Sequence, residues 1–209
     1  MQLTNYYWYF KSAIPHRICD DIVRYGKSIQ DQMAVTGGFD NKKLNKNQVK
    51  DLKKKRDSNI VWMNDRWIYK EIQPYVHQAN QNAGWNFQWD FSESCQFTKY
   101  EKGQFYDWHC DGWDKPYIRE DTNAPDHGKI RKLSVTVTLS DPKDYKGGEL
   151  EFDFRNLDPD KKRNVKKCKE ILPKGSLVVF PGFVWHRVCP VKSGSRHSLV
   201  IWNLGWPFK

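Results

Sequence analysis

The amino-acid sequence predicts a mainly β fold with helices at its N-terminus. Helix-type spacing of apolar residues is confined to residues 1–84. From Trp85 onward, short strand-like segments recur with turn signals between them. The chain has 209 residues, of which 15% are aromatic, which is enough for one compact core. We therefore expect a single domain over residues 1–209, in which a helical region at 1–84 supports an antiparallel β-barrel or sandwich at 85–209.

The first helix is expected soon after a short N-terminal strand. Residues 3–10, LTNYYWYF, are typical of a strand, and Pro15 suits the first turn of a helix. Gly37 and Gly38 are expected to end this helical segment. The apolar residues that define one helical face recur every three or four positions; they are Ile14, Ile18, Ile22, Tyr25, Ile29 and Met33.

A lysine-rich stretch separates this helix from a second one. Residues 42–56 are expected to form a mobile loop, and residues 60–62 a short strand. Pro74 lies inside the second helix, where it predicts a kink or a break because proline lacks a backbone N–H. The helix itself is predicted to end near residue 82, from the spacing of Ile68, Ile72, Tyr75 and Ala79.

Seven strand segments are expected in the β region. In the clearest, Leu133, Val135, Val137 and Leu139 alternate with Ser134, Thr136 and Thr138. Alternation places one apolar and one small polar face on the strand, as in a strand that lines a barrel. The segments are residues 85–91, 94–100, 104–111, 132–140, 149–154, 175–180 and 198–202.

Charge and cysteine content limit the environment of the protein. The net charge is +10, concentrated at residues 42–56 and 161–169. These are either two solvated basic loops or a patch that recruits an anionic partner. No apolar run of about 20 residues predicts a membrane span, and the N-terminus does not resemble a signal peptide. An odd number of cysteines without a CxxC motif predicts free thiols and a cytoplasmic location; they are Cys19, Cys95, Cys110, Cys168 and Cys189.

His109 and Asp111 form a candidate metal-binding pair. Residues i and i+2 of a strand point to the same face, so the imidazole and the carboxylate converge while Cys110 faces away. With a second imidazole they complete a facial triad, which leaves three metal positions open for co-substrate and O2 in iron(II) oxygenases. Taken alone, a His and an Asp at this spacing are common by chance.

A second motif near the C-terminus supplies the missing groups. His186 follows an apolar strand and a Pro-Gly turn, and Arg196 and Ser198 lie ten and twelve residues further on. A turn centred near Val191 would place His186 and Arg196 on adjacent strands at the same height. The planar guanidinium could then bind the far carboxylate of a dicarboxylate chelated to the metal, and Ser198 could add a hydrogen bond.

Together these residues resemble the prolyl 4-hydroxylase branch of the 2-oxoglutarate and iron(II)-dependent oxygenases. The resemblance covers about residues 92–204 and implies a double-stranded β-helix, or jelly roll. Residues 147–150, GGEL, resemble a strand of that family, and the spacing of His186 and Arg196 matches it. The pattern Y-x-x-G-x-x-Y-x-x-H-x-D is matched at Tyr100, Gly103, Tyr106, His109 and Asp111.

The resemblance also implies cofactors and residue roles. Iron(II) is expected, with 2-oxoglutarate and O2 as co-substrates and ascorbate as a further candidate. The metal ligands would be His109, Asp111 and His186. The 2-oxoglutarate site would comprise Arg196, Ser198, Tyr100 and Thr138. The residues near a peptide substrate would be Tyr106, Arg131 and Trp202, although Trp202 is equally well explained as a core residue.

The favoured function is hydroxylation of a peptide or protein side chain, with proline as the target and the protein acting as a monomer. One alternative is a related oxygenase acting on nucleic acid or a small molecule. The nucleic-acid branch usually carries a second arginine shortly after Arg196, which this sequence lacks. The other alternative is a non-catalytic basic jelly-roll binding module. Residues 112–129 and 42–56 have no clear counterpart in the family and could reshape the substrate groove.

The remaining histidines and the tryptophans beside the ligands carry weaker signals. His127 is expected to be an exposed decoy, and His197 should point away from Arg196. Two further histidines, His16 and His77, belong to predicted helices. The tryptophans near the ligands could either keep water out of the site or belong to the core; they are Trp108, Trp113 and Trp185.

Overall fold

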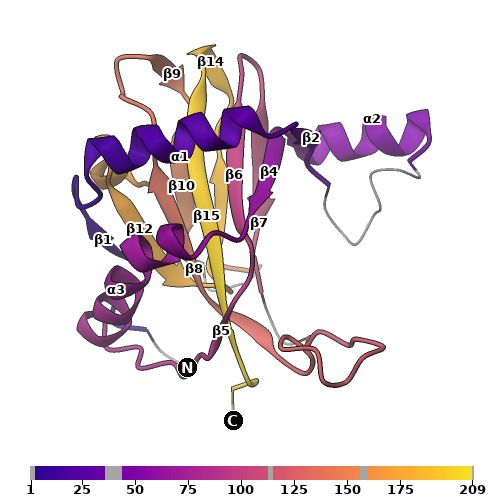
Figure 1. Ribbon diagram of the computed structural model, residues 1–209, viewed down its shortest axis with the longest axis vertical. Helices are drawn as coiled ribbons and strands as arrows, with labels where there is room; N and C mark the ends of the chain where they lie inside the picture. Colours follow the sequence, from indigo (N-terminus) through magenta and orange to yellow (C-terminus); the bar gives the residue numbers. More distant parts are fainter. Residues whose placement is uncertain (1–2, 36–43, 113–114, 156–159, 209) are drawn as a thin grey trace.

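The computed structural model describes residues 3–35, 44–112, 115–155 and 160–208. Within these residues, two antiparallel sheets face each other, and helices cover the outer face of the larger sheet (Figure 1). This arrangement agrees with the predicted jelly roll with N-terminal helices. No helix in the described part is long and apolar enough to cross a membrane.

The larger sheet has eight strands in the order β1-β12-β8-β15-β6-β4-β2, with β5 pairing to β15. Residues 1–84 contribute three of these strands, so the N-terminal region supplies part of the sheet as well as its helical cover. The strands are β1 (Trp8–Phe10), β2 (Gln32–Met33), β4 (Asn59–Met63), β5 (Phe91–Ser92), β6 (Cys95–Tyr100), β8 (Ile130–Thr138), β12 (Leu177–Pro181) and β15 (Arg196–Gly205).

The smaller sheet has five strands in the order β11-β10-β13-β7-β3. They are β3 (Arg56–Asp57), β7 (Phe105–His109), β10 (Leu150–Asp153), β11 (Val165–Lys167) and β13 (Trp185–Val188). A separate two-stranded ribbon joins β9 (Tyr145–Gly147) to β14 (Val191–Gly194). The seven predicted segments do not include β9, β11 or β14, each of which has only three or four residues, whereas a strand at His186 was expected and is found as β13.

Three α-helices complete the described fold. Helices α1 (His16–Ser28) and α3 (Arg66–Asn82) lie across the larger sheet, whereas α2 (Lys46–Lys55) projects away from the body of the molecule (Figure 1). A 3-10 helix, η2, spans Lys169–Ile171. Only the first and third of the α-helices cover the sheet (Figure 1).

The two faces of the larger sheet belong to two apolar cores. Leu133, Val135 and Val137 of β8 pack under the helices with Ile22 and Ile72. The second core lies between the sheets and joins residues of both, among them Phe152 and Phe180. The alternation predicted for residues 132–140 is therefore confirmed, and the polar face of β8 is turned toward the space between the sheets.

The first helix is shorter than predicted. It ends at Ser28, and Ile29 already has an extended backbone with φ −98° and ψ 139°. Met33, predicted to lie on the helical face, pairs instead with Asn59 as part of β2. Strand pairing with β4 therefore overrides the helical spacing, as tertiary contacts often override local propensity. Gly37 and Gly38 lie outside the described residues.

The prediction of a mobile loop at residues 42–56 is wrong for the part that the structure describes. Residues 46–55 form α2, whose N-terminus carries a capping box: the Asn45 side chain accepts from Gln48 N, and the Gln48 side chain accepts from Asn45 N. This reciprocal pair satisfies two backbone N–H groups that would otherwise be free. The Asn-x-x-Gln spacing was a local signal that the density of lysines obscured.

The second helix is confirmed and one strand is corrected. Helix α3 ends at Asn82, as predicted, and is not broken at Pro74, where Ile72 and Val76 on either side are buried against the sheet. Residues 85–91 are not a strand, apart from Phe91 in β5. Asn86 has a left-handed backbone with φ 52°, which no extended strand allows.

Candidate metal and co-substrate site

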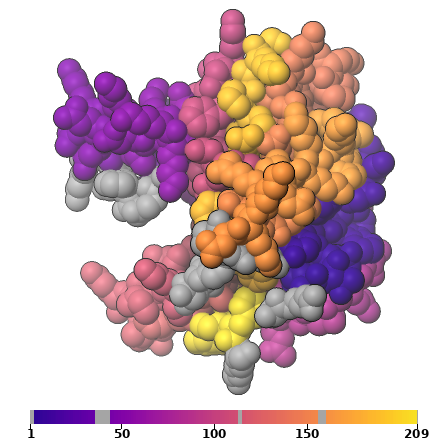
Figure 2. All heavy atoms as spheres, turned by 180° about the vertical axis from the view of Figure 1, so that it is seen from behind, coloured from indigo at the N-terminus to yellow at the C-terminus, as the bar shows by residue number. Residues whose placement is uncertain are grey.

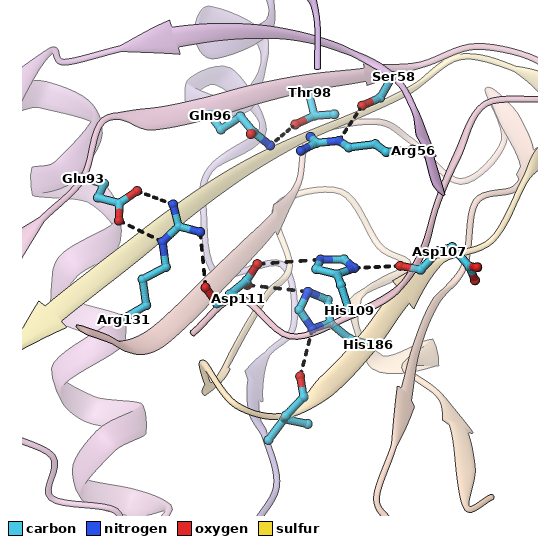
Figure 3. A network of polar contacts seen from close by, with 11 residues as sticks. Arg56, Ser58, Glu93, Gln96, Thr98, Asp107, His109, Asp111, Arg131 and His186 are labelled. Carbon is cyan, nitrogen blue, oxygen red and sulfur yellow. Dashed lines mark hydrogen bonds and ion pairs between the residues drawn. The ribbon is translucent and has the colours of Figure 1, made fainter. Parts of the chain in front are cut away.

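Three candidate ligands meet between the two sheets (Figure 3). The Nε2 atom of His109 lies 3.7 Å from Asp111 Oδ1, and the Nε2 atom of His186 lies 3.5 Å from Asp111 Oδ2. Ligand atoms placed about 2.1 Å from one ion at right angles are separated by about 3 Å. The donor set of two imidazoles and one carboxylate therefore fits a single divalent ion. Among the described residues, the candidate ligand atoms of His109, Asp111 and His186 all lie within 4.8 Å of one another.

Local backbone geometry brings the triad together. His186 pairs with His109, and Val188 pairs with Tyr106, so three residues of β13 lie opposite four of β7. This irregularity is a β-bulge, a feature that often re-aims side chains near active sites. Asp111 lies just beyond β7, where its backbone N–H donates to Gly182 O at 2.9 Å. The Pro-Gly turn before β13 thus holds the third ligand in place.

Hydrogen bonds orient both imidazoles. His109 Nδ1 donates to Asp107 O at 2.7 Å, and His186 Nδ1 donates to Val184 O at 3.0 Å. Because a carbonyl oxygen can only accept, each Nδ1 carries a proton, and in the neutral ring Nε2 is left with its lone pair turned toward Asp111. Backbone carbonyls commonly fix metal-binding histidines in this way.

Burial and charge tune the triad for metal binding. Burial, followed by the neighbouring His186, holds the pKa of His109 well below its ordinary value. Burial alone would raise the pKa of Asp111, but the neighbouring His186, His109 and Arg131 outweigh it and bring that pKa to about 2. At neutral pH, His109 is therefore an uncharged donor and Asp111 a carboxylate, as metal binding requires.

Arg196 reaches the same pocket from the opposite sheet. It is 2% exposed, and its Nη1 donates to Ser198 Oγ at 3.2 Å. Its guanidinium lies 5.6 Å from the ring centre of Tyr100. No carboxylate pairs with it among the described residues, so this buried cation is available to an anionic ligand. A Cβ on Gly148 would lie 2.9 Å from Arg196 Cδ, which explains the glycine in the GGEL segment.

The expected hairpin between His186 and Arg196 is wrong. His186 belongs to β13 of the smaller sheet and Arg196 to β15 of the larger one, with β14 between them in sequence. The two side chains nevertheless line one pocket, because they face each other across the space between the sheets. The convergence that the sequence predicted arises from sheet packing and not from a shared turn.

The other predicted site residues lie around this pocket in different ways. Tyr100, Tyr106 and Trp202 line it directly. Thr138 pairs in register with Ser198 on the neighbouring strand. Arg131 lies beside Asp111 and donates from Nη1 to Asp111 O at 3.4 Å. The roles of these residues toward co-substrate and substrate stay predictions, but their positions are compatible with them.

Arg131 is part of a partly buried ion pair. Its Nε and Nη2 donate to the two carboxylate oxygens of Glu93 at 2.8 and 2.5 Å, and its guanidinium lies 3.9 Å from the ring centre of Trp202. Burial alone would lower the pKa of Arg131, but the hydrogen bonds and charge of Glu93 raise it. Such a doubly bonded pair is rigid, so Arg131 can position Asp111 and Trp202.

Sequence reasoning missed Arg56 as a pocket residue. It follows α2, is 5% exposed and lines the pocket with the triad. Its Nε donates to Ser58 Oγ at 3.0 Å, its guanidinium lies 4.4 Å from the ring centre of Tyr106, and its buried Nη2 has no hydrogen-bond partner within the described chain. In the sequence, Arg56 is one of several cations in a lysine-rich run, and nothing there distinguishes it.

The weaker candidates lie elsewhere. His127, expected to be exposed, is only partly exposed in the loop after Asp111, where its Nδ1 accepts from Arg119 N, and it is not part of the metal group. His197 points away from the pocket and stacks on Phe97, as predicted. The guanidinium of Arg187 lies 4.8 Å from the ring centre of Trp108. This contact does not decide whether Trp108 keeps water out of the site or belongs to the core. Trp113 lies outside the described residues.

Comparison with known proteins relates the chain to hydroxylases. A PKHD-type hydroxylase of Xanthomonas euvesicatoria is 36% identical over 108 residues, which cover 51% of this chain and 42% of that protein. A PKHD-type hydroxylase of Synechococcus is 36% identical over 110 residues, or 52% of this chain and 40% of its own length. The matched region thus spans about two fifths of the length of these relatives.

Solved structures extend the likeness to the whole fold. The viral collagen prolyl hydroxylase from Paramecium bursaria Chlorella virus-1 superposes with a TM-score of 0.63 and 21% identity, covering 97% of each chain. A prolyl-4-hydroxylase from Pseudomonas putida gives 0.61 and 19%, covering 96% of this chain and 92% of its own. The model of the 2OG-Fe(II) oxygenase superfamily matches residues 95–203, which include all three candidate ligands and Arg196. The chain therefore belongs to the 2OG-Fe(II) oxygenase superfamily.

Proposed function

We propose that this protein hydroxylates a side chain of a peptide or protein, with peptidyl proline as the favoured target. The reaction consumes 2-oxoglutarate and O2. One oxygen atom enters the substrate C–H bond to give an alcohol, and the other enters succinate as 2-oxoglutarate loses CO2. Iron(II), when bound, supplies the redox chemistry of this reaction.

One observation carries the proposal: a three-ligand group and a buried guanidinium without a carboxylate partner in the described chain share one pocket. A facial set of three protein ligands leaves positions open for a chelating co-substrate and O2. Arg196 is placed to bind the other end of a dicarboxylate, in the bidentate geometry that guanidinium and carboxylate favour. A purely structural metal site would need neither the open positions nor the arginine.

The chain's own residues would bind, orient and shelter the reactants. His109, Asp111 and His186 would hold the metal, and Arg196 with Ser198 would fix the distal carboxylate. Apolar side chains of both sheets complete the pocket wall, among them Leu150, Val188, Val200 and Trp202. By displacing water, such a wall strengthens electrostatic contacts within the site and protects a reactive centre from side reactions.

The choice of a peptide substrate is supported by two kinds of relative. The curated relatives are hydroxylases of the PKHD type, and one similar structure is a prolyl hydroxylase in complex with a peptide fragment, from Trichoplax adhaerens, with a TM-score of 0.60 and 16% identity. The alternative, oxidation of nucleic acid, is disfavoured because the sequence has no second arginine shortly after Arg196. Use of ascorbate, a monomeric state and a cytoplasmic location stay predictions.

The proposal is tested by incubating the iron-loaded protein with 2-oxoglutarate, O2 and proline-containing peptides. We expect succinate formation, together with a peptide mass gain of one oxygen atom. The variant His186→Ala serves as the control for adventitious iron chemistry. Succinate formation by this variant at the wild-type rate would contradict the assignment of the site, and its absence in the wild-type protein with every substrate would contradict the proposed function.

A further inference from the structure

Helix α2 is well formed but contributes little to the core. Its capping box and the three lysines in its last turn, which complement the helix dipole, stabilise it locally. Leu52 is its one buried residue. Because the helix is capped but buries a single residue, we expect its exposed surface to matter more than its packing.

The surface of α2 is strongly basic. All five of its lysines are exposed: Lys46, Lys50, Lys53, Lys54 and Lys55. Lys54 contacts Asp51 at 2.8 Å and Lys53 contacts Asp57 at 3.7 Å, and exposed pairs of this kind hold their partners weakly. Lys46, Lys50 and Lys55 have no carboxylate partner among the described residues. The helix therefore presents positive charge that the fold itself leaves largely uncompensated.

This charge lies at the mouth of the pocket. The residue after the helix, Arg56, lines the pocket and lies over Tyr106. Arg56 also begins β3, which pairs with β7, the strand that ends at the ligand His109. The helix thus ends beside the pocket that contains the candidate metal ligands.

The other side of the mouth has a different charge character. Residues 115–129 follow shortly after Asp111, and Figure 2 shows a hollow between this segment and α2. The segment satisfies several of its own charges: Arg119 pairs with Asp126, and Lys129 pairs with Asp90. One wall of the hollow is therefore strongly positive, while the other is close to neutral.

We propose that α2 is a substrate-docking surface that binds acidic residues flanking the hydroxylation target. This inference rests on the proposed function, because it assigns the substrate class of the same pocket: an acidic peptide or protein segment. Lys46 and Lys50 contact the flanking carboxylates, and these contacts steer the segment toward the pocket. The folded helix gives the positive charges a fixed direction, which a mobile loop could not do.

The test compares labelled peptides and paired charge variants. Three peptides share a central proline and carry glutamate, glutamine or lysine at the flanking positions. Lys46→Glu/Lys50→Glu reverses the charge of α2. Lys162→Glu/Lys169→Glu makes the same change beside β11, at the opposite edge of the smaller sheet from β3 and α2. Binding is measured by fluorescence anisotropy with the full chain, and peptide-independent succinate formation is measured in parallel.

We expect the wild-type protein to prefer the glutamate peptide. At low salt, the α2 variant should bind this peptide roughly tenfold more weakly than the wild-type protein does. Near 0.5 M salt this difference in affinity should largely vanish, because charges then attract each other over only a few ångströms. The β11-side variant should change by less than about twofold. Succinate formation without peptide should be the same in all three proteins, because the substituted residues lie outside the pocket.

Three results would overturn the inference: no preference among the peptides, an equal loss in both charge variants, or α2-dependent binding of a single-stranded oligonucleotide but not of the glutamate peptide. Each of these is distinguishable from failure of the proposed function. In that case succinate would not form in any of the proteins, whatever the peptide affinities. A lost preference together with intact succinate formation contradicts the docking surface alone.

Discussion

One face of β15 lines the pocket, and its other face packs in the apolar core under the helices. Arg196, Ser198, Val200 and Trp202 face the pocket between the sheets. Leu199 and Ile201, between them in sequence, are at most 1% exposed and pack under the helices. Residues one position apart on a strand point in opposite directions, so this strand separates ligand binding from core packing without any change in backbone.

The comparison shows that one face of β15 stabilises the fold, whereas the other buries an uncompensated charge. The helix-covered face of β15 is apolar, and its burial stabilises the fold by about 25 cal/mol per Å² removed from water. The pocket face buries a guanidinium whose charge no carboxylate of the described chain neutralises, which is unfavourable until an anion binds. Substitutions on the two faces should therefore separate: pocket residues change ligand binding, and core residues change the free energy of unfolding.

The largest effect is expected at the metal. His186→Ala removes one of three ligands, and we expect the affinity for iron(II) to fall by about 10³-fold, since each ligand of a protein metal site contributes on the order of 4 kcal/mol. Anaerobic calorimetric titration of the metal-free protein with iron(II) measures this. The metal-free variant should still unfold cooperatively. An unchanged iron affinity would contradict the triad.

The next effect concerns the pocket face of β15. Arg196→Met keeps much of the side-chain volume but removes the charge, so the affinity for 2-oxoglutarate should fall by about 10²-fold. Arg196→Lys should restore part of it, because a lysine keeps the charge and loses the planar fork. Titration of 2-oxoglutarate into the metal-loaded protein without O2 gives both values. If the Met and Lys variants bind equally, charge recognition at this position is wrong.

The opposite face of the same strand should behave in the reverse manner. Leu199→Ala creates a cavity under the helices and should lower the free energy of unfolding by about 2.5 kcal/mol. Urea denaturation measures this change. At temperatures where the variant is folded, its affinity for 2-oxoglutarate should match that of the wild-type protein. A large loss of co-substrate affinity in this variant would show that the two faces are not independent.

The smallest effect depends on pH. Burial, and then the charges of Lys27, Lys99 and Arg196, lower the pKa of His197 to about 4. In the unfolded chain its pKa is about 6.5, so between these values the unfolded state binds the extra proton. The contribution of His197 to stability is therefore complete above about pH 6.5 and is lost as the pH falls toward 4, by on the order of 2 kcal/mol.

The variant His197→Gln isolates this contribution. It cannot gain the proton, so the decrease in its free energy of unfolding between pH 6.5 and 4 should be smaller than that of the wild-type protein by about the same 2 kcal/mol. Urea denaturation at several pH values provides the comparison. Parallel pH profiles for the two proteins would show that His197 does not titrate in this range.

Local patterns in the sequence were sufficient for much of the site. The alternation around Val135 predicted an antiparallel barrel or sandwich, and the spacings of His109, Asp111, His186 and Arg196 predicted the metal group, while the family resemblance implied the jelly roll. These features depend on strand geometry, which repeats every two residues wherever a strand forms. These features could therefore be predicted without information on which strands are neighbours.

Tertiary structure alone decided how the parts meet. His186 and Arg196 face each other from different sheets, although their spacing suggested a hairpin. The segment around Met33 became a strand because β4 was available to pair with it. Arg56 became a pocket residue because β3 pairs with β7 beside Tyr106. In each case the deciding contact joins residues that are distant in the sequence, or depends on which sheet a strand enters, and no local spacing records that.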